Sequence, residues 1–112
     1  LRSEYYWWGS AKGMSGIEVS PDSKHLYVIV WENDGDGFEH FLVQYDLTQD
    51  DSLQFANSGV IIDTCFTKRL QLAPDGKIYG DHYLENIRYL DVINDVWEMG
   101  PLCNFEKDAF NL

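Results

Sequence analysis

Apolar and polar residues alternate along much of the chain in short runs, and turn-forming residues separate these runs. At 17–20 and again at 41–48, apolar side chains occupy every second position. This period of two predicts half-buried β-strands. Residues 25–31 are nearly all apolar, β-branched or aromatic, which predicts a central strand buried on both faces. Because few segments carry a helical period, we predict an all-β chain.

Two turn signals stand 53 positions apart and divide the pattern into two similar halves. Residues 20–23 and 73–76 each carry proline second and aspartate third, an order that favours a tight turn. Each turn is followed by a lysine and soon afterwards by an aliphatic–tyrosine pair, Leu26-Tyr27 or Ile78-Tyr79. A repeat of about 40–50 residues that holds about four short strands is typical of β-propeller blades.

The repeat predicts how the 112 residues are organised. Blade-like units are expected at 14–63 and 66–105, with 1–13 a strand or linker from a preceding unit. The predicted fold is β-propeller-like, a partial propeller of two four-stranded antiparallel blades. Residues 48–52 are predicted as a polar loop, and 60–62 as a fourth, outer strand. Further strands are predicted at 69–72, 77–79 and 87–93.

An ordered set of short motifs runs between residues 13 and 112. The motifs are GIEVSPD (16–22), LYV (26–28), QYDL (44–47), LQLAPDGKIY (70–79), YL (89–90), VIN (92–94), and Gly100 with CNF (103–105). In these motifs the chain resembles the propeller-like, WD40-like or SPDG-repeat region of gliding-motility-associated and surface proteins of Bacteroidetes-type bacteria. It departs from their pattern at 80–82 and at the acidic hairpin around Asp34.

The resemblance implies an exported protein, secreted or held at the cell surface, in which this region is one part of a longer chain. It implies no catalytic residue and no cofactor. The expected partners are further propeller blades of the same polypeptide or identical copies of this chain, together with a protein or glycan ligand. We interpret the start at Leu1, without an initiator methionine, as either the loss of a leader or a piece of a longer protein.

The charge balance excludes several classes of partner. The chain has 19 acidic and 8 basic residues, a formal net charge of −11. A surface this negative repels phosphate groups, and no stripe of lysine or arginine offsets it, so nucleic-acid binding is not expected. The same repulsion argues against docking on anionic lipid. The longest apolar stretch, 26–31, is too short for a membrane helix, so no membrane insertion is expected.

The acidic loop at 33–37 is the one motif that suggests a cation site. Closely spaced carboxylates in a loop bind hard cations such as Ca²⁺. Counted from Glu32, however, the twelfth position of an EF-hand loop falls on Val43, which offers no ligand. An ordinary hairpin turn is the favoured interpretation. We therefore predict no metal site and no requirement for a metal in folding.

The histidines do not suggest a catalytic site. His25, His40 and His82 are scattered and lack metal-ligand spacing. Asp81 could orient His82 as a base, but no serine or cysteine stands nearby in the sequence as a nucleophile. A propeller enzyme would need polar groups on its inner strands. The positions where such groups are expected are apolar: Ile17, Val19, Leu70 and Leu72.

Two cysteines and a run of aromatic residues complete the candidates. Cys65 and Cys103 are predicted either to form a disulfide or to stay as two buried free thiols, and the sequence leaves both open. Four aromatic residues stand in a row near the start: Tyr5, Tyr6, Trp7 and Trp8. Such a run packs in a core or between blades, or contacts a partner or a sugar ring.

These observations favour a non-enzymatic interaction or structural module of a larger exported protein. One alternative is a fragment of a propeller-type enzyme of the lactonase or lyase kind. Another is a carbohydrate-binding module that uses exposed aromatic residues. A spacer within a long adhesin-like chain is a further structural alternative.

Overall fold

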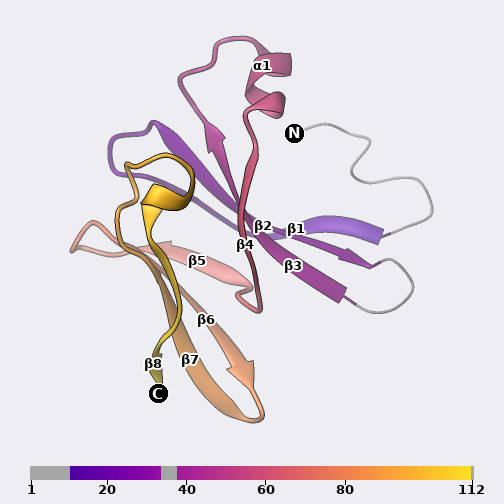
Figure 1. The fold of residues 1–112 in the computed structure, drawn as a ribbon, viewed down its shortest axis with the longest axis vertical. Coiled ribbons are helices and arrows are strands. Elements are labelled where there is room, and N and C mark those ends of the chain that lie inside the picture. The colour runs from indigo at the N-terminus through magenta and orange to yellow at the C-terminus, as the bar shows by residue number, and fades with distance from the viewer. Residues whose placement is uncertain (1–10, 34–37, 112) are drawn as a thin grey trace.

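The computed structural model describes residues 11–33 and 38–111, which form two four-stranded antiparallel sheets (Figure 1). In each sheet, strands that follow one another in the chain are neighbours. The first sheet, sheet A, consists of β1 (Ala11–Val19), β2 (His25–Asn33), β3 (Phe38–Asp46) and β4 (Val60–Cys65). The second, sheet B, consists of β5 (Arg69–Leu72), β6 (Ile78–Leu84), β7 (Ile87–Ile93) and β8 (Phe105–Asn111). The predicted all-β class is confirmed.

The two predicted turns close in the same way. The backbone N–H of the fourth residue donates to the carbonyl of the first, Ser23 to Ser20 and Gly76 to Ala73. The aspartate of each turn accepts a hydrogen bond from the backbone N–H two residues later. Ser23 has a φ of 61° and Gly76 a φ of 85°, so both turns end in the left-handed region. The turn predictions are confirmed.

A hydrophobic core lies between the two sheets. Sheet A contributes residues on one face of β2, β3 and β4, and sheet B contributes residues of β6 and β7, while the β7–β8 connection covers one end. The buried members are Tyr27, Ile29, Leu42, Cys65, Ile78, Ile93, Val96 and Cys103. Leu70 and Leu72 of β5 pack against this core.

The opposite face of sheet A is also apolar. Leu26, Val28, Val43 and Tyr45 form a second buried cluster there, and Phe55 packs against it. Side chains alternate between the two faces of a strand, so β2 supplies both clusters with successive residues. The prediction that 25–31 is a central strand buried on both faces is confirmed for residues 25–29, and the two that follow are half-buried.

Sheets A and B meet closely along β1 and β5. The Glu18 carboxylate of β1 accepts a hydrogen bond of 3.0 Å from the backbone N–H of Leu72. A Cβ atom at Gly16 would lie 3.0 Å from the Lys68 carbonyl and 3.1 Å from the Arg69 Cα atom. A side chain at position 16 would therefore push the neighbouring backbone away by a few tenths of an ångström, and glycine allows the close approach.

A short helix lies between β3 and β4. The sequence predicted a polar loop at 48–52 and no helix after it. Helix α1 (Ser52–Asn57) is capped by Asp51, whose carboxylate accepts hydrogen bonds from backbone N–H groups of the first turn. The Phe55 ring stacks on Tyr45 with a centroid distance of 5.2 Å. A 3-10 turn, η2 (Gly100–Cys103), precedes β8. In the described part of the chain no helix is long and apolar enough to cross a membrane.

Candidate functional site

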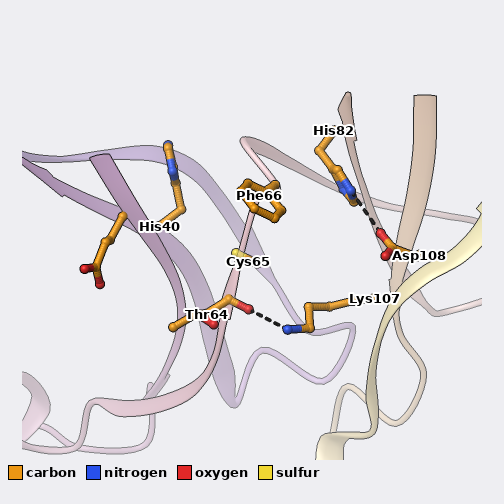
Figure 2. A pocket seen from close by; sticks show the side chains of 8 residues that line it. His40, Thr64, Cys65, Phe66, His82, Lys107 and Asp108 are labelled. Carbon is orange, nitrogen blue, oxygen red and sulfur yellow. Dashed lines mark hydrogen bonds and ion pairs between the residues drawn. The ribbon is translucent and has the colours of Figure 1, made fainter. Parts of the chain in front are cut away.

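The most distinctive polar site lies beside a cavity of about 340 Å³ between the two sheets. Figure 2 shows His40 of sheet A on one side of this cavity and His82 of sheet B on the other, with Phe66 between them. Residues 64 and 65 at the end of β4, and residues 107 and 108 of β8, complete most of the lining.

The buried Asp91 carboxylate holds the other polar groups of the site in place. Asp91 is 1% exposed. Its carboxylate accepts three hydrogen bonds. The His82 Nδ1 atom lies 2.8 Å from Oδ2, the Thr67 hydroxyl donates to the same oxygen at 2.5 Å, and the Asp108 backbone N–H donates to Oδ1 at 2.9 Å. A buried carboxylate is tolerated when it is satisfied in this way.

This arrangement fixes the orientation and the tautomer of His82. Because the Asp91 carboxylate only accepts, the imidazole must donate its Nδ1–H, which leaves Nε2 with a lone pair in the neutral ring. His82 is 5% exposed, and Nε2 makes no aligned hydrogen bond with any described residue. Asp108 Oδ1 lies 3.0 Å from Nε2, close enough for an ion pair but outside the direction of a hydrogen bond.

A β-bulge brings Asp108 to this position. Leu90 pairs with Phe110 and Val92 with Glu106, so three residues of β8 stand opposite Asp91 alone. Asp108 has a φ of 55°, a left-handed conformation that costs energy for a non-glycine residue. Bulges of this kind redirect side chains, and this one turns the half-exposed Asp108 carboxylate toward His82.

Aromatic rings hold the imidazole in place. The Tyr89 ring stacks on His82 with a centroid distance of 5.4 Å, and Phe66 lies at 5.9 Å in a tilted arrangement. Tyr89 is the cross-strand partner of His82. These contacts exclude solvent from the ring, and Nε2 is buried beside Asp108.

The structure places the other sequence candidates away from this constellation. Asp81, adjacent to His82 in sequence, forms ion pairs with Arg88 at 2.9 Å and Arg69 at 3.7 Å, so it does not orient His82. Successive residues of a strand point to opposite faces, which explains why Asp91 and not Asp81 is the partner. His25 lies at the far end of β2 and contacts the Trp97 carbonyl at 3.0 Å.

His40 lines the cavity without joining the constellation. Burial lowers the pKa of its imidazole, and the charge of Lys68 lowers it further. The Lys107 ammonium bridges the two sheets nearby and donates to the Thr64 carbonyl at 3.2 Å (Figure 2). It also contacts the Asp63 carboxylate at 3.3 Å.

The remaining candidates are the thiols and two segments outside the described residues. Cys65 and Cys103 are free thiols in the same inter-sheet core, and burial raises the pKa of both. The raised pKa disfavours the reactive thiolate form of both, and the arrangement corresponds to the second of the two alternatives that the sequence leaves open, two buried free thiols. The run of Tyr5, Tyr6, Trp7 and Trp8, and residues 34–37 of the acidic loop, lie outside the described residues.

Comparison with known proteins found no match to any family model, curated protein or solved structure. The resemblance to gliding-motility-associated surface proteins therefore stays a prediction. The function is inferred below from the chain's own contacts.

Proposed function

We propose that this chain is a non-enzymatic interaction and structural module of a larger exported protein, built as a partial β-propeller with sheets A and B as its blades. Two features support the propeller topology: each sheet is a four-stranded meander, and the first strands of the two sheets, β1 and β5, lie against one another. In a propeller, each blade buries its faces against its neighbours.

One observation carries the proposal: a row of aliphatic residues crosses all four strands of sheet A on the face turned away from sheet B. The register pairs Ile17 with Val28, Val28 with Val43, and Val43 with Ile61. Val28 and Val43 are buried, whereas Ile17 is 57% and Ile61 63% exposed. The row therefore ends in open aliphatic side chains on both edge strands.

The aliphatic side chains of this row indicate an apolar partner. Fully burying an isoleucine side chain stabilises a complex by about 1.5–3 kcal/mol, so two exposed ones favour an apolar cover. The near face of sheet A shows which cover fits, because sheet B packs there with Ile78 and Ile93. We assign the far face to another sheet of the same kind, supplied by a further blade or by a second copy of this chain.

The enzyme alternative has less support in the contacts. The inner-strand leucines, Leu70 and Leu72, pack in the inter-sheet core, and Val19 packs on the far face. None of these positions offers an acid, base or nucleophile to a substrate. A carbohydrate-binding module would depend on Tyr5, Tyr6, Trp7 and Trp8, which lie outside the described residues.

Light scattering on the 112-residue chain tests this proposal. We expect concentration-dependent self-association that strengthens with salt, because salt screens the repulsion between copies of net charge −11 while the apolar contact remains. Ile17→Glu places a carboxylate in the row and should shift the chain to a monomer.

Gln71→Glu is the matched control. It adds one carboxylate to an exposed position of β5, an edge strand of sheet B that lies outside the row. The control should associate like the unaltered chain. A chain that stays monomeric at every concentration and salt level, or two variants that behave alike, would count against the proposal.

A further inference from the structure

We infer that His82 Nε2 and the Asp108 carboxylate bind a divalent transition-metal ion, with Asp91 as the residue that positions the histidine. The site is independent of the proposed interaction face, because its residues belong to β6, β7 and β8 of sheet B. It is also distinct from the acidic loop at 33–37, where the sequence suggested a hard cation.

The first argument is the unsatisfied Nε2 atom. His82 is 95% buried, its Nδ1–H is committed to Asp91, and its buried Nε2 atom has no aligned hydrogen-bond partner among the described residues. A buried polar atom of this kind carries a desolvation cost, which a bound cation would offset. A neutral imidazole offers a lone pair there, which binds a metal ion.

The second argument is electrostatic. With His82 neutral, the Nε2 lone pair and the Asp108 Oδ1 atom lie 3.0 Å apart and repel one another, whereas a protonated His82 forms an ion pair with Asp108. A positive species between them removes the repulsion. Asp91 and Asp108 together bring two carboxylates to one histidine, so a divalent cation matches the local charge.

The third argument is coordination geometry. Metal-bound histidines commonly donate their other ring N–H to a carboxylate, which holds the ring and raises its basicity. Asp91 does this for His82, and its two oxygens are already occupied by Thr67, His82 and the Asp108 N–H. Asp91 is therefore a positioning residue, and the direct ligands are His82 and Asp108.

The 3.0 Å separation also limits the kind of ion. The two atoms would subtend about 90° at an ion about 2.1 Å from each, and a small rotation of the half-exposed Asp108 side chain widens this angle toward the tetrahedral value that Zn²⁺ prefers. One imidazole and one carboxylate suit Zn²⁺, Ni²⁺ or Cu²⁺ better than Ca²⁺, which prefers oxygen ligands alone. Water would complete the coordination from the cavity that His82 and Asp108 line.

Calorimetric titration of the chain with ZnCl₂ in a non-chelating buffer tests the site. One ion should bind per chain, and Asp108→Asn should weaken binding by at least about 10-fold because it removes a direct ligand. Asp91→Asn should weaken it by about 10–100-fold, the usual effect of losing the carboxylate that orients a metal-bound histidine. Asp108 is half-exposed, so Asp108→Asn should leave the fold intact. His82→Ala, in contrast, would remove a buried side chain and open a cavity.

Asp63→Asn is the matched control. Asp63 is similarly exposed and also lies near residue 107, but on β4, away from His82. The control should bind Zn²⁺ within about 2-fold of the unaltered chain. Nitrogen-15 NMR adds a site-specific readout, since Zn²⁺ should shift the Nε2 resonance of His82 and not those of His25. Equal binding by the Asp108 and Asp63 variants, an unmoved His82 resonance, or no binding at millimolar Zn²⁺ would overturn the assignment.

Discussion

Asp46, the last residue of β3, fixes the loop that leads into helix α1. Its Oδ1 atom accepts from the Thr48 hydroxyl at 2.6 Å and from the Thr48 backbone N–H at 2.9 Å, and its Oδ2 atom accepts from the Gln49 amide at 3.0 Å. The Thr48 hydroxyl bond and then the Gln49 bond lower the pKa of this carboxyl from 3.8 to about 2. Hydrogen bonds to the ionised form have this effect.

This lowered pKa predicts how stability depends on pH. Since the unfolded chain binds a proton at position 46 more readily, the contribution of Asp46 is present above its ordinary pKa of 3.8 and is lost as the pH falls toward about 2. Asp46→Asn removes this titration. Urea unfolding between pH 7 and pH 2 should show a smaller acid loss for this variant than for the unaltered chain.

The neighbouring Asp50→Asn exchange controls for the loss of one negative charge, because Asp50 is exposed in the same loop. It should keep the acid dependence of the unaltered chain. An Asp46→Asn variant whose stability falls with pH as steeply as that of the Asp50 variant would show that Asp46 does not carry the effect.

At the scale of elements, Gln44 joins β3 to the connection between β7 and β8. Its amide nitrogen donates to the Glu98 carbonyl at 2.8 Å and to the Tyr27 hydroxyl at 2.9 Å, while its carbonyl accepts from the Gly100 N–H at 2.8 Å. Tyr27 in turn donates to the Val96 carbonyl at 2.7 Å. This buried network attaches the β7–β8 connection to sheet A and closes one end of the core.

Removal of this side chain should be costly. Gln44→Ala leaves several buried polar groups without partners, each worth about 1–3 kcal/mol, so we expect a loss of about 2–4 kcal/mol in the free energy of unfolding. Gln54→Ala, on the exposed face of α1, is the control and should change the free energy by less than about 0.5 kcal/mol. Urea titration measures both, and a Gln44 variant as stable as the Gln54 variant would refute the structural role of the network.

The strands were predictable from sequence because their signals are local. Alternation identified β3, the apolar run identified β2, and the proline–aspartate turns located the hairpin between the first and second strands of each sheet. Helix α1 was missed because six residues are too few to show a helical period. Strand β8 was not predicted either, since its bulge at Asp108 breaks the alternation.

The metal-binding constellation was not predictable, because it depends on pairing between strands. The partner of His82 is nine positions away across the β6–β7 hairpin, and the sequence offered the adjacent Asp81 instead. Only the register shows that Asp91 lies on the His82 face. Asp91 does leave one trace: it is a charged residue within the otherwise apolar run 89–93.

At the scale of the molecule, the two sheets differ in what remains for a partner. Sheet A carries an aliphatic row that is buried in the middle and open at both edges, whereas the outer face of sheet B carries the ion pairs of Asp81 with Arg69 and Arg88. The continuous aliphatic row belongs to sheet A, and association through it is the central claim of the proposed function.

Methyl NMR across a range of protein concentrations tests this claim most directly, because it reads individual isoleucines. Ile17 and Ile61 lie at the open ends of the row, while Ile78 and Ile93 are fully buried in the inter-sheet core and serve as internal references. The account predicts that the Ile17 and Ile61 methyl resonances shift with concentration and that the two reference resonances do not. Four resonances that stay unmoved, or that move together, would contradict it.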